Sequence, residues 1–151
     1  MTAKEYLSQA YRLDKQADMI LQKAAALRKS LYGRGQNYEN TGHNSNTDGI
    51  AKAIEKVSDY ERRADEIIDR LVDMRIKIET TISLVPDPIQ REVLERRYLL
   101  YQSWDGFYDK ISGQYIRGIC EIMGYSRSQV FKHHRKGLET VKMRLKEIER
   151  D

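Results

Sequence analysis

Two long stretches of this chain carry apolar residues at alternating steps of four and three, and this repeat constrains the fold more than any other feature. The first stretch contains eight such positions: Tyr6, Ala10, Leu13, Ala17, Ile20, Ala24, Leu27 and Leu31. The second contains eight more: Ala53, Val57, Tyr60, Ala64, Ile67, Leu71, Met74 and Ile78. This spacing is typical of helices that pack along a coiled-coil seam. We therefore expect two long helices, each burying one apolar stripe.

Local signals set the limits of the first helix. Thr2 and Glu5 have the spacing of a capping box, so the helix should begin at Ala3 and extend over residues 3–32. Residues 33–49 contain four glycines and four asparagines and show no apolar period. Such a composition predicts a flexible loop.

The second helix is expected over residues 50–84. Pro86 disfavours helical geometry in Val85, which predicts the end of the helix there. Two long helices joined by one loop predict a long antiparallel coiled-coil hairpin over residues 1–85. Because such a hairpin leaves apolar surface uncovered, we expect the chain to form a homo-oligomer, in the simplest case a dimer.

Residues 86–151 predict a second domain built from shorter helices, so the fold class is all-α. Asp87 can cap a helix that has Pro88 at its first position. Gly113–Met123 is predicted to form a further helix, which ends at Gly124.

The segment around Gly124 has the spacing of a helix-turn-helix. Cys120 is a small residue in the first helix, Gly124 allows the turn, and Val130 packs back from the second helix. Ser126 and Gln129 form another capping box at the start of that second helix. The motif points to duplex DNA as the partner.

The helix that starts near Ser126 is expected to carry a basic outer face. Residues 117–146 hold eight basic and two acidic residues, a local net charge of +6, whereas the whole chain has +4. Arg127 is the candidate for a bidentate base contact, and Lys132, Arg135, Lys136 and Ser126 are candidates for phosphate contacts. The candidate DNA-binding residues are Arg117, Ser126, Arg127, Ser128, Gln129, Phe131, Lys132, Arg135 and Lys136. A solvated basic face without a ligand is the alternative interpretation.

The C-terminal part resembles region 4 of sigma-70-type factors. The resemblance is carried by REVLERRY (Arg91–Tyr98), by Trp104, and by IMGYSRSQVFKHHRKGLETVK (Ile122–Lys142). Together with the opening MTAKEYLSQAYRLDK (Met1–Lys15), it makes the chain similar to ArpU- and RinA-like late-gene regulators of Gram-positive phages and prophages. The resemblance implies a phage transcription regulator and a possible contact with RNA polymerase. In that family the tryptophan lies nearer the turn glycine, so a segment around Trp104–Tyr115 looks inserted.

Other classes of function fit the sequence less well. We find no Cys/His spacing for a metal and no nucleophile or kinase signature, so we expect neither an enzyme nor a cofactor. Cys120 is the only cysteine and no apolar run approaches about 18 residues, which predicts a cytoplasmic protein without a membrane span. The resemblance to phage regulators implies that this cytoplasm is that of a bacterial host. Two alternatives stay open: a small-terminase-like DNA-packaging protein, and an adaptor that binds RNA polymerase.

Overall fold

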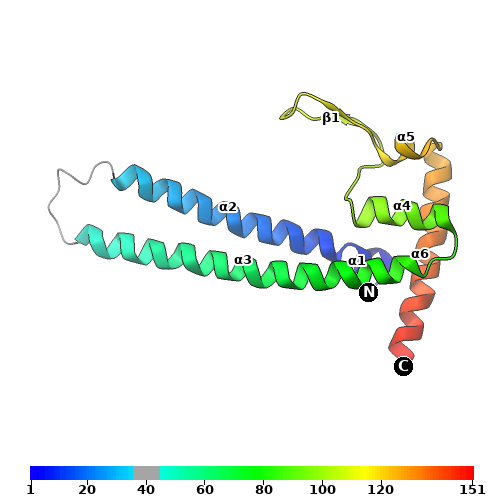
Figure 1. Ribbon diagram of the computed structural model, residues 1–151, viewed down its shortest axis with the longest axis horizontal. Coiled ribbons are helices and arrows are strands. Elements are labelled where there is room, and N and C mark those ends of the chain that lie inside the picture. Colours follow the sequence, from blue (N-terminus) through cyan, green and yellow to red (C-terminus); the bar gives the residue numbers. More distant parts are fainter. Residues whose placement is uncertain (36–44) are drawn as a thin grey trace. The chain divides into compact units, whose positions relative to one another are not determined.

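The computed structural model describes residues 1–35 and 45–151, and these are mostly helical (Figure 1). The helices are α1 (Ala3–Leu7), α2 (Gln9–Gly35), α3 (Ser45–Ser83), α4 (Pro88–Tyr98), α5 (Ile119–Met123) and α6 (Arg127–Arg150). Two short strands, β1 (Phe107–Tyr108) and β2 (Tyr115–Ile116), pair antiparallel. The all-α prediction is confirmed except for this β-ribbon. Within the described residues, no helix is both long and apolar enough to cross a membrane.

The chain divides into two compact units. One unit is Arg12–Val72, and the other combines Met1–Tyr11 with Asp73–Asp151. This division differs from the predicted boundary between residues 85 and 86. Both ends of the predicted 1–85 domain are packed with the C-terminal helices instead.

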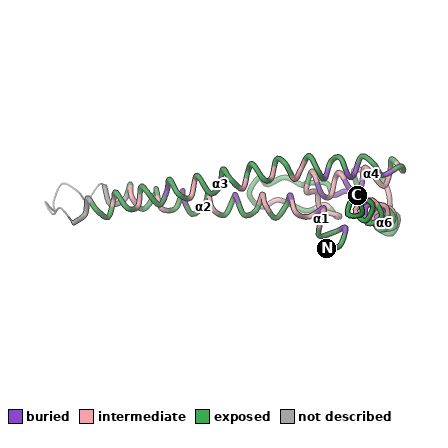
Figure 2. The backbone as a smooth tube through the Cα atoms, turned by 90° about the horizontal axis from the view of Figure 1, so that it is seen from below, coloured by how far each residue is buried: buried purple, intermediate pink, exposed green. Residues whose placement is uncertain are grey.

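In the unit Arg12–Val72, α2 and α3 lie side by side and run in opposite directions (Figures 1 and 2). The apolar repeat faces inward: Ala17, Ala24, Val57 and Ala64 are buried, and the other repeat positions between residues 12 and 72 are half-buried. Most positions between them are exposed. The two helices also form an ion pair between Arg28 and Glu61.

Both long helices extend further than the sequence predicted. α2 continues to Gly35 and α3 already begins at Ser45, so the predicted loop 33–49 is wrong at both of its ends. The rest of that predicted loop, residues 36–44, lies outside the described residues. A polar, glycine-containing composition lowers helix propensity, but it does not prevent a long helix from continuing by one turn.

The predicted helix over residues 3–32 is interrupted at Ser8. The Thr2–Glu5 capping box is present, but α1 ends at Leu7 and α2 begins at Gln9. The Ser8 hydroxyl donates a hydrogen bond to the Lys4 carbonyl at 2.7 Å. A serine that bonds back to the preceding turn competes with the regular helix, which accounts for an interruption at this position.

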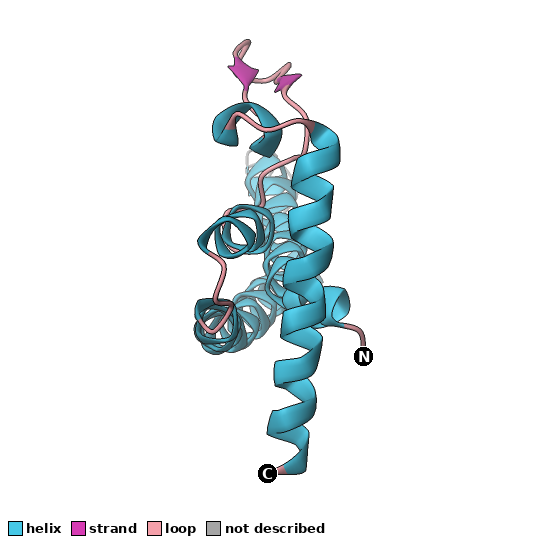
Figure 3. Cartoon of the chain, turned by 90° about the vertical axis from the view of Figure 1, so that its right-hand side faces the viewer, coloured by secondary structure: helices cyan, strands magenta, loops and turns pink. Residues whose placement is uncertain are grey.

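In the other unit, α4 and α1 pack against α6, the long helix that ends at the C-terminus (Figure 3). The Asp87 side chain caps α4 by accepting hydrogen bonds from the backbone N–H groups of Ile89 and Gln90. α4 and α6 approach closely at Gly137, where an added Cβ would stand 3.0 Å from Leu94 Cδ1. α6 extends to Arg150, in agreement with the predicted end near residue 149.

The predicted helix Gly113–Met123 is wrong in its first half. Only Ile119–Met123 is helical, and residues 115 and 116 belong to β2. The segment that looks inserted is therefore a β-ribbon rather than an extension of the helix. Its base is closed by two backbone hydrogen bonds, from Ile119 N–H to the Ser103 carbonyl at 2.9 Å and from Cys120 N–H to the Trp104 carbonyl at 3.2 Å.

Candidate nucleic-acid interface

The turn between α5 and α6 is built around Gly124. Its φ of 70° lies in the left-handed region, which a glycine adopts without the strain that a Cβ would add. The N–H groups of Gly124 and Tyr125 both donate to the Cys120 carbonyl, at 3.0 and 3.2 Å. These bonds satisfy the end of α5 and turn the chain toward α6.

The start of α6 is fixed by a capping box. The Ser126 hydroxyl accepts a hydrogen bond from Gln129 N–H at 3.3 Å, and Gln129 Oε1 accepts one from Ser126 N–H at 3.1 Å. Two of the candidate DNA-binding residues therefore position the helix with their side chains. To contact a ligand as predicted, Ser126 would have to donate its hydroxyl hydrogen and Gln129 its amide N–H groups, because both side-chain oxygens already accept hydrogen bonds within the capping box.

A small apolar core holds α6 against α4 and α5. It is formed by Val93, Ile119 and Val130, all fully buried. Trp104, Cys120, Met123 and Tyr125 pack around it. With Val130 directed inward, the opposite side of the first turns of α6 is left open to solvent.

Lys132, Arg135 and Lys136 occupy this open side together with Ser128, and all four are exposed. Arg127 is exposed as well, but it lies about one helical turn before Val130, on the side where it meets Asp105. The sequence therefore placed these five candidates correctly on the outer surface of α6. A row of cations on one exposed helix face produces a positive local potential to which phosphate groups are attracted.

Arg127 is held by two contacts. Its guanidinium lies 3.4 Å from the Asp105 carboxylate and 5.1 Å from the centre of the Phe131 ring. Both charged side chains are more than half exposed, so this ion pair contributes little to stability. It nevertheless directs Arg127 along the helix surface. Asp105 was not among the sequence candidates, because nothing in its local pattern links it to α6.

Phe131 differs from the other candidates because it takes part in packing. Its ring meets the edge of Trp104 with a centroid distance of 5.1 Å, and it is only 36% exposed. The guanidinium of Arg97 lies 4.8 Å from the centre of the same Trp104 ring. Phe131 therefore supports the surface on which Arg127 lies.

Lys136 faces the start of α4. The pKa of Asp87 is lowered mainly by the hydrogen bond from the Gln90 backbone, against a smaller effect of burial, and the positive charge of Lys136 adds to the lowering. Lys136 thus lies at the edge of the basic face, near a carboxylate. Lys132 and Arg135 are exposed on the same helix, and no ion pair is found for either within the described residues.

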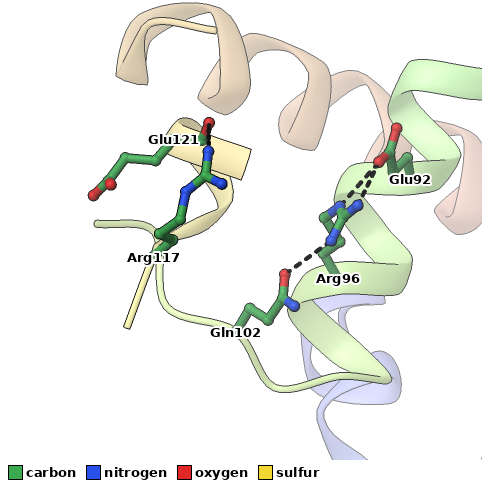
Figure 4. A network of polar contacts seen from close by, with 5 residues as sticks. All are labelled: Glu92, Arg96, Gln102, Arg117 and Glu121. Carbon is green, nitrogen blue, oxygen red and sulfur yellow. Dashed lines mark hydrogen bonds and ion pairs between the residues drawn. The ribbon is translucent and has the colours of Figure 1, made fainter. Parts of the chain in front are cut away.

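Arg117 is not on a helix, contrary to the prediction. It follows β2 directly, and its guanidinium donates to the backbone carbonyl of Glu121 at 3.2 Å (Figure 4). On α4, Arg96 bonds Glu92 at 2.9 Å and also reaches the Gln102 side chain at 3.4 Å. The two arginines stabilise the segments before and after the ribbon.

A buried polar pair joins α6 to α4 beneath the basic face. The Tyr98 hydroxyl lies 2.8 Å from His134 Nε2, and the two rings stack with centroids 5.8 Å apart. Burial, with smaller effects of Lys4 and Arg97, lowers the pKa of His134 to about 4, and burial raises the pKa of Tyr98 to about 12. His134 is therefore neutral near pH 7 and serves packing between α6 and α4.

No protein-family model matches this chain, and comparisons with curated proteins and with solved structures give no significant match. The interpretation of the surface accordingly rests on its own geometry and charge.

Proposed function

We propose that the chain is a phage or prophage transcription regulator that binds duplex DNA through a sigma-region-4-like helix-turn-helix formed by α5, the Gly124 turn and α6. The observation that carries the proposal is the exposed basic surface on the first turns of α6, where Lys132 and Arg135 lie on the side opposite the buried Val130. A helix capped at its N-terminus and basic on its outer side has the dimensions and charge needed to enter a major groove.

Within this proposal the residues have different roles. Arg127 is the reading residue, since a guanidinium can pair bidentately with guanine once it leaves Asp105. Lys132 and Arg135 neutralise phosphates on either side of the groove. The capped N-terminus of α6 presents backbone N–H groups to a further phosphate, and Arg117 contacts the backbone from the segment before α5.

We further propose that α2 and α3 form an antiparallel coiled coil through which two copies associate. The support is apolar surface outside the buried repeat: Met19 and Ile54 are each 54% exposed, and Val72 is 51% exposed. Apolar side chains of this size on long helices favour burial against another protein surface. A homodimer would suit DNA half-sites separated by about one helical turn or a multiple of it.

The direct test is selection of bound sequences from a random duplex pool, followed by affinity measurements across a salt series. Lys132→Gln should reduce the slope of log affinity against log salt by about one, because one phosphate contact is lost. Arg127→Ala should weaken binding to the selected DNA sequence more than binding to a scrambled sequence. Lys146→Gln, a change at an exposed position far along α6, is the matched control and should leave both properties unchanged.

Undetectable DNA binding at low salt would contradict the proposal. Retention of purified RNA polymerase by the same protein would then favour the adaptor function. Selected sequences that map to a packaging site instead of promoters would favour the small-terminase-like function.

A further inference from the structure

A cavity of about 400 Å³ lies beside the core of the unit that contains the C-terminal helices. Its lining comes from α1, the start of α2, the end of α4 and the segment that leads into β1. The lining residues are Lys4, Ser8, Tyr11, Arg97, Tyr98, Tyr101, Ser103 and Phe107. A cavity of this size is within the range of about 300–1,000 Å³ found for small-molecule sites.

The charge of the lining is entirely positive. Lys4 and Arg97 contribute two cations, and no acidic residue is among the lining residues. Arg97 is fixed in place, because it donates to the Gln102 carbonyl at 3.0 Å and lies over the Trp104 ring. Lys4, the other cation of the lining, is exposed.

The positive charges of Lys4 and Arg97 also act on a half-buried histidine next to the cavity. His134, which bonds the Tyr98 hydroxyl at the wall of the cavity, has a pKa lowered first by burial and then by the charges of Lys4 and Arg97. Two cations near a desolvated wall attract an anion more strongly than the same groups on open surface.

Aromatic rings form the other main part of the lining. The rings of Tyr11 and Tyr101 meet edge to face at a centroid distance of 5.3 Å. Tyr101 has a φ of 56°, a left-handed geometry that is strained for a tyrosine, and Arg75 Nη1 donates to its hydroxyl at 3.1 Å. These contacts hold the ring in one place before any ligand enters.

We propose that this cavity binds a small organic anion that carries a flat ring, such as a nucleoside monophosphate or an aromatic carboxylate. Lys4 and Arg97 would neutralise the acidic group, and Tyr11, Tyr101 and Phe107 would contact the ring. The proposal goes beyond DNA binding and does not depend on it.

The test is isothermal titration calorimetry of the full chain with adenosine monophosphate and with benzoate. Adenosine and benzyl alcohol are the neutral partners of these probes, and inorganic phosphate tests the acidic group alone. At least one of the two ring-bearing anions should bind at micromolar to millimolar concentration, and its neutral partner should bind about tenfold more weakly. The stronger of the two anions identifies the kind of acidic group that the site prefers.

A variant then locates the binding. Lys4→Gln should lower the affinity for the preferred anion by about tenfold, because one charge-assisted hydrogen bond is lost. The substitution is at an exposed position that does not support the core. Lys52→Gln, an equivalent change on exposed α3, should leave the affinity unchanged. The proposal is overturned if neither ring-bearing anion binds at millimolar concentration, if each neutral partner binds as well as its anion, or if Lys4→Gln binds as wild type does.

Discussion

In Arg12–Val72 two helices meet through a repeat of small and aliphatic side chains, most of them only half-buried. The unit of Met1–Tyr11 and Asp73–Asp151 instead has a core of fully buried aliphatic side chains, to which aromatic contacts, helix caps and single hydrogen bonds are added. In the first unit each contact resembles the next, so the loss of one is shared along the helices. In the second, few contacts can replace one another. The difference indicates that single substitutions will act strongly in one unit and weakly in the other.

The largest expected effect is in the core beneath α6. Ile119→Ala removes a fully buried side chain and should lower the free energy of unfolding by about 3 kcal/mol. Leu27→Ala, at a half-buried repeat position of α2, should cost about 1 kcal/mol. Denaturant unfolding can follow both, since Trp104 is the only tryptophan and reports on its own unit, while circular dichroism reports on all helices. Equal losses would remove the contrast between the units.

The next effect concerns pH. The pKa of His134 is about 4 in the folded chain, below its ordinary value near 6.5, so the unfolded chain binds the proton more readily. Stability from this residue is present above pH 6.5 and is lost as the pH falls toward 4. Allowing for the partial exposure of the ring, the loss between pH 7 and pH 5 should be about 1 kcal/mol.

His134→Gln is the matched variant, because its amide can still bond the Tyr98 hydroxyl but does not titrate. Its stability should change less than that of the wild type over the same pH interval. Parallel stability curves for the two proteins would contradict the assignment of the pH effect to His134.

Replacing a glycine by alanine should change the free energy of unfolding in opposite directions in the two units. Gly124→Ala forces a side chain into left-handed geometry and should cost about 1 kcal/mol. Gly49→Ala lies within α3 with open space around the new Cβ, so it should stabilise by up to about 1 kcal/mol. Thermal melts followed by circular dichroism compare the two, and a gain from Gly124→Ala would contradict the role given to the turn.

The smallest effect is expected for the ion pair between α2 and α3. Glu61→Gln removes the partner of Arg28 at a half-buried position, and the loss should be below about 0.5 kcal/mol and should fade in high salt. Denaturant titration at two salt concentrations measures it. A loss above 1 kcal/mol would mean that charge pairs, rather than the apolar repeat, hold this unit together.

The sequence predicted those parts whose signals repeat or are local. Four such features are present in the structure, and each depends only on residues close together in the sequence: the apolar repeat, the Asp87 cap, the Ser126–Gln129 capping box and the turn at Gly124. The exposed basic residues of α6 follow from the same helical period. Their action on DNA stays a prediction.

The parts that were missed depend on contacts between distant residues. The ribbon has strands of only two residues, too short for an alternating pattern, and it is stabilised where Ser103 and Trp104 bond the start of α5. Likewise, neither Asp105 nor Arg127 carries a local sign that the two side chains meet. Contacts of this kind cannot be predicted from the local sequence, because they depend on how the chain folds.

The closed base of the ribbon has an evolutionary consequence. The chain leaves the fold after Asp105 and returns at Gly118, where an added Cβ would collide with the backbone of Asp105. Entry and exit are therefore adjacent, and the bonds at the base do not depend on the length of the loop between them. A single insertion or deletion could change that length without moving the two points at which the loop joins the helices.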